Sequence, residues 1–139
     1  MSLERAVEIA KELEKRKATN TLKHYKPYEY QINFHNTIAS QRLLMAGNRI
    51  GKSFCGAMEM AYHLTGKYPD WWKGKKFDKP IRAWVGGVSN ETTRDVCQKE
   101  LVGQPDDPGA KGTGSIPLDD IGDTTRKPGV PNAMNSLVI

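Results

Sequence analysis

The sequence predicts an α/β domain with a parallel sheet, preceded by a helix near the amino terminus. An apolar run at 43–46 comes before a glycine-containing loop and a helical pattern over 54–64, and a second apolar run at 81–85 is followed by another helical pattern. Alternation of strands and helices is typical of domains built on a parallel sheet. The chain has 139 residues, which is enough for one domain with a hydrophobic core.

Residues 1–22 are expected to form a helix and a linker ahead of the main domain, which would span 23–139. The apolar residues of this helix fall on one stripe at helical spacing: Leu3, Ala6, Val7, Ala10 and Leu13. Because the stripe is rich in alanine, we expect it to lie on a neighbouring surface rather than in the centre of a core.

Segment 25–35, before the first predicted strand, is rich in aromatic residues and holds a single glutamine. In many ATP-driven motors an aromatic ring and a glutamine upstream of the phosphate-binding loop recognise adenine. The ring stacks on the base, and the amide forms hydrogen bonds with its Hoogsteen edge. Tyr28 and Gln31 fit this arrangement. The alternative is a helix with core aromatic residues and an exposed glutamine.

Residues 46–53 carry the pattern of a phosphate-binding loop (P-loop), in which a glycine, four free residues and Gly-Lys-Ser/Thr lie between a strand and a helix. Ala46 stands in place of the first glycine, and the flanking strand and helix patterns are in the required order. The alternative is a glycine-rich turn that ends in Gly-Lys-Ser by chance.

The chemistry expected of this loop is the binding of ATP and Mg²⁺. Gly47 and Gly51 permit backbone angles that turn N–H groups toward phosphate oxygens at the positive end of the following helix. Lys52 would reach the outer phosphates, and the Ser53 hydroxyl would bind Mg²⁺. The loop residues expected to contact the nucleotide are Ala46, Gly47, Asn48, Arg49, Ile50, Gly51, Lys52 and Ser53.

The segment 68–80 combines paired tryptophans, Trp71 and Trp72, with clustered lysines. Aromatic and basic residues together can bind nucleic acid, but buried tryptophans that anchor a long loop are the commoner explanation. The strand predicted at 81–85 follows, and Ser89 or Asn90 would cap the next helix.

From 103 to 131 the chain is rich in glycine, proline and aspartate without a visible period, so we expect a mobile loop or one that orders on binding. Asp119 and Asp120 are the candidates for an acidic pair that binds Mg²⁺, but Pro117 cannot donate to a strand ladder before them. We interpret Asp119 as a turn or cap residue. A further strand is expected to begin at 135.

Lys and Arg outnumber Asp and Glu by 21 to 16, for a net charge of +5. This excess suits contact with a polyanion or is ordinary solubility charge. Cys55 and Cys97 lack metal-ligand spacing and are expected to be free thiols in a reducing cytoplasm. No apolar run is long enough to span a bilayer, so we expect a soluble intracellular protein.

Several of these stretches together resemble the large terminase subunit of tailed bacteriophages, a motor that packages double-stranded DNA. The likeness runs from about residue 23 to the last residue and is carried by 26–31, 46–53, 81–87 and 112–117. The resemblance implies a RecA-like ATPase domain, with Tyr28 and Gln31 on adenine. Lys52 and Arg49 would be the catalytic cations, with Arg49 near the γ-phosphate.

The resemblance also implies partners and a location. These are double-stranded DNA, the portal protein, the small terminase subunit and further copies of the same chain, with no membrane, in the host cell cytoplasm. The acidic strand end, catalytic glutamate, coupling motif and nuclease carboxylates of the family have no match here. We therefore expect a partial domain that stops before the acidic strand end and is inactive alone. A helicase-type translocase and a non-catalytic nucleotide-binding or assembly module are the alternatives.

Overall fold

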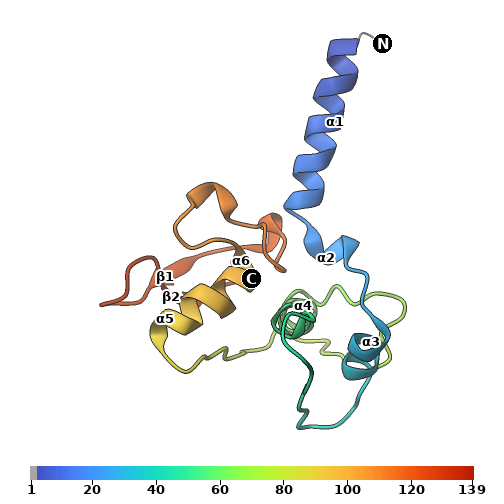
Figure 1. The fold of residues 1–139 in the computed structure, drawn as a ribbon, viewed down its shortest axis with the longest axis vertical. Coiled ribbons are helices and arrows are strands. Elements are labelled where there is room, and N and C mark those ends of the chain that lie inside the picture. The colour runs from blue at the N-terminus through green and yellow to red at the C-terminus, as the bar shows by residue number, and fades with distance from the viewer. Residues whose placement is uncertain (1–2) are drawn as a thin grey trace.

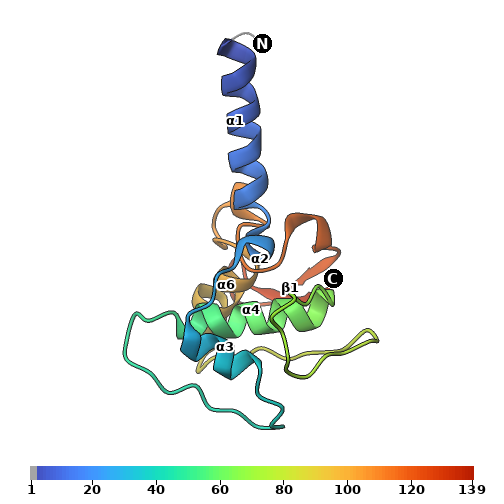
Figure 2. The ribbon, with the colours of Figure 1, turned by 90° about the vertical axis from the view of Figure 1, so that its right-hand side faces the viewer.

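Helix α4 (Lys52–Thr65) lies at the centre of the structure, a computed structural model that describes residues 3–139 (Figures 1 and 2). It ends at Gly66, whose left-handed backbone (φ 68°) closes the last turn, as the sequence predicted. One face of α4 packs into the core, where its most deeply buried side chains are Cys55, Met58, Ala61 and Tyr62.

Three helices precede α4. Helix α1 (Leu3–Ala18) buries no residue and projects from the rest of the molecule (Figure 1). The short helices α2 (Thr21–His24) and α3 (Glu29–His35) follow. The surface that we expected under the apolar stripe of α1 is therefore absent from the part of the chain that the structure describes.

After α4, the chain returns to helix only at α5 (Asn90–Thr92), which continues through a π-helix, η1 (Thr93–Gln98), into α6 (Lys99–Val102). The Ser89 hydroxyl accepts a hydrogen bond from the Thr92 N–H at 3.1 Å, so the predicted cap at Ser89 is confirmed. Two 3-10 helices follow: η2 (Pro108–Ala110) and η3 (Leu118–Asp120).

The predicted α/β class with a parallel sheet is wrong, and so is the partial RecA-like fold. The described residues form one sheet of two antiparallel strands, β1 (Thr124–Arg126) and β2 (Met134–Leu137). Thr125 lies opposite Ser136, and a bulge follows between Thr125 and Arg126. The strand expected from 135 is therefore real, but its partner lies in a stretch that showed no strand pattern.

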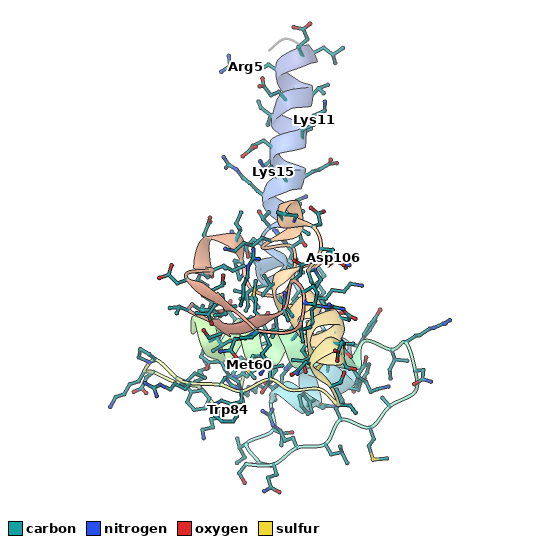
Figure 3. All side chains as sticks on the ribbon, turned by 90° about the vertical axis from the view of Figure 1, so that its left-hand side faces the viewer. Arg5, Lys11, Lys15, Met60, Trp84 and Asp106 are labelled. Carbon is teal, nitrogen blue, oxygen red and sulfur yellow. The ribbon has the colours of Figure 1, made fainter. Side chains whose placement is uncertain are left out.

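The two apolar runs at 43–46 and 81–85 are irregular and mostly exposed. Leu43 is 80% exposed, Met45 82% and Trp84 95%. Figure 3 shows Trp84 on the extended segment that runs past α4. A strand requires a neighbour for its N–H and C=O groups, and within residues 3–139 neither run has one. The apolar composition of the two runs predicted that they would be buried, but no neighbouring strand within residues 3–139 covers them.

Part of the loop expected to be mobile is instead ordered against α6. The Ser115 and Ile116 N–H groups donate to the Glu100 and Leu101 carbonyls at 2.8 and 2.9 Å, and both side chains are fully buried. At Gly114, a Cβ atom would lie 2.4 Å from the carbonyl carbon of Leu101. Glycine is required here because the two backbones approach so closely.

Trp72 anchors the loop after α4, as the sequence predicted. Its ring is 3% exposed, and its indole N–H donates to the Lys75 carbonyl at 3.0 Å. It packs with Leu22, Met58, Tyr62 and Ile116 in the hydrophobic core. No helix within residues 3–139 is long and apolar enough to cross a membrane.

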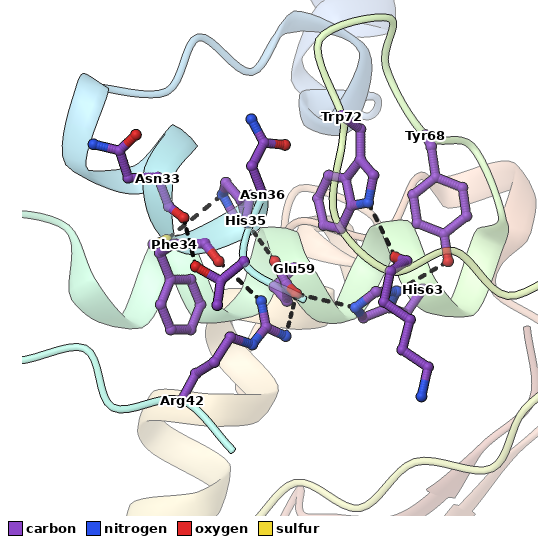
Figure 4. Close-up of polar contacts among 12 residues, drawn as sticks. Asn33, Phe34, His35, Asn36, Arg42, Glu59, His63, Tyr68 and Trp72 are labelled. Carbon is purple, nitrogen blue, oxygen red and sulfur yellow. Dashed lines mark hydrogen bonds and ion pairs between the residues drawn. The ribbon is translucent and has the colours of Figure 1, made fainter. Parts of the chain in front are cut away.

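Next to this core lies a buried ionic group that we call the Glu59 cluster: Glu59, His35, Arg42 and His63 (Figure 4). His35 Nδ1 contacts Glu59 Oε2, while Arg42 Nη2 and His63 Nε2 lie 2.5 and 3.0 Å from Glu59 Oε1. Glu59 is 7% exposed and His35 0%. The cluster thus joins α3, the segment before the loop and α4 at one carboxylate.

The glycine contacts give a matched pair of stability predictions. Gly114→Ala should destabilise the fold by about 1–3 kcal/mol, since the added methyl group meets rigid backbone. Gly56→Ala should stabilise it by about 0.5–1 kcal/mol, because alanine favours a helix interior and its Cβ would meet no atom within 4 Å. Urea unfolding measures both. Equal effects of the two substitutions would contradict the close packing at Gly114.

The Glu59 cluster predicts a specific loss of stability in acid. Burial by itself raises the pKa of Glu59, but hydrogen bonds from His35, His63 and Arg42 lower it from 4.5 to about 2. The ionised carboxylate therefore contributes stability above pH 4.5 that is lost as the pH falls through 2. This loss should be on the order of 3 kcal/mol.

Urea unfolding of the wild type and Glu59→Gln between pH 7 and pH 2 measures this effect. The amide does not titrate, so the variant should be less stable at pH 7 and should lose less stability between pH 4.5 and 2. Parallel pH profiles for the two proteins would contradict the role of Glu59.

Candidate functional site

The predicted phosphate-binding loop joins an extended segment to the amino end of α4. Residues 48–49 form a turn, and Gly51 (φ 83°) is the N-cap of the helix. The first bond of α4 runs from the Cys55 N–H to the Gly51 carbonyl at 2.9 Å. The N–H groups ahead of Cys55 therefore lie at the positive end of a helix, where an anion is stabilised.

Two residues of the loop have a left-handed backbone, but only one of them is a glycine for which the sequence predicted special backbone angles. Gly51 adopts it as expected, and the second residue is Arg49, with φ 62°. Gly47 does not have positive φ, and a Cβ there would meet no atom within 4 Å. The tight turn of the loop is therefore made at Arg49 and Gly51, and Gly47 instead leaves one side of the loop open.

Lys52 folds back over the loop that precedes it. Its ammonium donates to the Ala46 carbonyl at 2.8 Å and to the Gly47 carbonyl at 2.5 Å. The Lys52 ammonium therefore lies against the first two residues of the loop. Ser53 follows in the first turn of α4 with an exposed side chain, and Asn48, Arg49 and Ile50 are also exposed.

Gln31 connects α3 to the loop. Its Oε1 accepts from the Tyr28 N–H at 2.9 Å, and its Nε2 donates to the Gly51 carbonyl at 3.4 Å. The side chain is 2% exposed, so the expectation of an exposed glutamine in the alternative interpretation is wrong. Both polar atoms of the Gln31 amide therefore have partners within the chain.

Tyr28 and Tyr30 lie beside Gln31 as a stacked pair, with ring centroids 6.1 Å apart and planes 11° from parallel. Tyr28 is 70% exposed, so one face of its ring is open for stacking. Tyr30 is the residue that the sequence interpretation missed. Its hydroxyl donates to the Ile50 carbonyl and so fixes the loop directly.

The electrostatics at Tyr30 agree with this donor role. Desolvation raises the pKa of the Tyr30 hydroxyl, with smaller contributions from Cys55 and Tyr28. The hydroxyl therefore keeps its proton near neutral pH. The only sequence signal for it was the spacing of three tyrosines at 25, 28 and 30, which does not distinguish their roles.

The described residues form no cluster of three acidic, histidine or cysteine side chains that could hold a metal ion. Cys55 and Cys97 are free thiols. Burial raises the pKa of Cys55 to about 11, so this thiol is unreactive near neutral pH. Asp120 forms an ion pair with Lys67, with the two charged atoms 2.6 Å apart, and neither residue belongs to the predicted loop. Asp119 lies in the short helix η3, as a turn residue.

A cavity of about 280 Å³ lies elsewhere, between α6 and the β1–β2 hairpin. Gln98 closes it on one side by donating to the Asn132 carbonyl at 2.9 Å and accepting from the Met134 N–H at 2.8 Å. No residue of the predicted phosphate-binding loop lines this cavity. The candidate site is therefore the open loop surface at the amino end of α4.

Comparison with known proteins bears on what kind of protein carries this loop. The large terminase subunit of Salmonella phage P22 is 37% identical to the chain over 147 aligned residues, which cover 96% of this chain and 30% of that protein. The chain thus spans about a third of the length of this relative. No solved structure matches the chain significantly.

Residues 43–137 match the model of a protein family described as the N-terminal part of the large terminase subunit of T4-like-virus type. The match begins just before the predicted phosphate-binding loop and includes α4, α6 and the hairpin. Because it spans well over half of the sequence, the chain belongs to the family of terminase large subunits.

Proposed function

We propose that this chain is the ATP-binding part of a viral DNA-packaging motor, in which ATP hydrolysis drives double-stranded DNA into a procapsid. The observation that carries the proposal is the junction of three elements at the loop: the amino end of α4, the Lys52 ammonium and Gln31 on Gly51. Family membership supports the packaging role of the parent protein.

Each part of the nucleotide has a partner in this proposal. The triphosphate lies on the N–H groups at the amino end of α4, where Lys52 leaves its two carbonyl partners to bind it. Ser53 binds Mg²⁺, and Arg49 contributes a second cation. The magnesium ion neutralises phosphate charge when bound, while the residues of the chain hold and orient the nucleotide.

Adenine is proposed to lie on the exposed face of Tyr28, with Gln31 at its edge. Tyr30 supports the Tyr28 ring by stacking on it, and it supports the loop because its hydroxyl donates to the Ile50 carbonyl. This geometry favours adenine recognition over the alternative, in which the aromatic residues only fill a core.

In the parent protein, the proposed partners are double-stranded DNA, the portal protein, the small terminase subunit and further copies of the chain, in the host cytoplasm. The excess of basic residues supports contact with DNA phosphates. The helicase-type translocase shares the same nucleotide contacts. Packaging of DNA by the parent, as opposed to strand separation, distinguishes the two.

The first functional prediction concerns the base. Tyr28→Ala and Gln31→Ala should each weaken ATP binding by about 1–3 kcal/mol, since one removes a stacking surface and the other a buried hydrogen bond. Displacement of a fluorescent ATP analogue measures this. Trp84→Ala, which removes an exposed aromatic side chain outside the loop region, is the matched control and should leave affinity unchanged. Equal displacement by GTP and ATP would contradict adenine recognition.

The second functional prediction concerns turnover. The 139-residue chain should bind ATP, lose binding in Lys52→Ala and hydrolyse no ATP above background. Hydrolysis requires a group that orients water as well as the phosphate-binding loop and Mg²⁺, and the sequence offers no acidic pair after a buried strand. Phosphate release with Mg²⁺ measures this. Clear release that disappears in Lys52→Ala would show that a carboxylate of this chain completes the site.

A further inference from the structure

The segment that leads into the phosphate-binding loop, residues 37–50, has almost no support from the core. Ile38 is 81% exposed, Leu43 80% and Met45 82%. Figures 1 and 2 both show this segment as a long excursion at the end of the molecule opposite α1. In the described chain, the hydrogen bonds from residues 38–45 to other residues all come from Arg42.

Arg42 makes three contacts with two different elements (Figure 4). Nη1 donates to the Phe34 carbonyl at 2.9 Å, at the end of α3, and Nη2 donates to Glu59 Oε1 at 2.5 Å, in the middle of α4. The guanidinium also lies over the Phe34 ring, 4.8 Å from its centroid. One side chain therefore fixes the segment against both helices that build the candidate site.

The chemistry of the contact requires arginine. The planar guanidinium carries several N–H groups in a fixed fork, so it can donate to a carbonyl and a carboxylate at once while its face lies on a ring. A lysine ammonium in the same place is a point charge without this fork. Glu59 is itself held by His35 and His63, so the carboxylate is a fixed partner rather than a mobile one.

We propose that Arg42 is a positioning residue for the phosphate-binding loop. It does not touch the ligand but fixes the path of residues 37–46 onto the Glu59 cluster, so that Ala46 and Gly47 face Lys52. The loop is then held at two places, at Arg42 before it and by Tyr30 and Gln31 at its end. The effect on nucleotide binding rests on the function proposed above, whereas the effect on the segment does not.

Nitrogen-15 relaxation of the 139-residue chain tests the proposal in the absence of nucleotide. In the wild type, the amides of 38–46 should have order parameters close to those of α4. In Arg42→Ala and Arg42→Lys they should fall below about 0.6, the range of flexible backbone. Arg82→Ala, which removes an exposed arginine outside the Glu59 cluster, is the matched control and should change nothing in this segment.

Affinity for a non-hydrolysable ATP analogue gives the second measurement. Both Arg42 variants should bind it about tenfold more weakly, an effect of the size expected for loss of one charged hydrogen bond, with the amides of α4 still ordered. If Arg42→Ala unfolds the chain, Arg42→Lys decides, because it keeps a cation beside Glu59. A segment in Arg42→Lys as rigid as in the wild type would overturn the proposal.

The two measurements separate the failure of each proposal. If the wild type binds no nucleotide, the proposed function is wrong, and the order parameters still decide whether Arg42 fixes the segment. If the wild type binds the analogue and Arg42→Lys binds it equally well, Arg42 does not position the loop. Loss of order throughout α4 in both variants would make Arg42 a general stability residue and would also overturn the inference.

Discussion

A carboxylate buried among aromatic rings is the constraint on which the rest of the structure depends. Glu59 lies on the inner face of α4, and an ionised group in that place is tolerated only when hydrogen-bonded cations or donors surround it. His35 comes from α3, Arg42 from the segment before the loop and His63 from the next turn of α4. Satisfying one charge thus brings together the elements that form the candidate site.

The same constraint explains why the aromatic residues lie where they do. His63 Nδ1 is 2.9 Å from the Tyr68 hydroxyl, and the His35 ring lies against Trp71 and Trp72. These rings cover the cluster from solvent, which strengthens each hydrogen bond inside it. A purely apolar core could have held α4, but it would not have fixed the direction of Arg42.

Helices could be predicted because their ends are marked by a few neighbouring residues, whereas the sheet could not be predicted because a strand depends on a distant strand to pair with. The left-handed Gly66 and the Ser89 cap are properties of a few neighbouring residues, so α4 and the helix from Asn90 could be expected from sequence alone. The runs at 43–46 and 81–85 have strand composition, yet a strand forms only against another strand, and pairing is not a local property. In the candidate site, the sequence pattern singled out the loop residues as a prediction. Tyr30 and Arg42 could not be predicted in this way, because they contact the loop region through hydrogen bonds that residue spacing does not reveal.

The exposure of Trp84 has an optical consequence for any solution study of this chain. Its side chain is 95% exposed, whereas Trp72 is buried and Trp71 partly so. A soluble quencher will therefore reach Trp84 freely, Trp71 in part and Trp72 hardly at all. The most readily quenched emission reports mainly on residues 81–87, and the emission that resists quencher reports on Trp72 in the aromatic core, so the protein carries probes of two regions without any label.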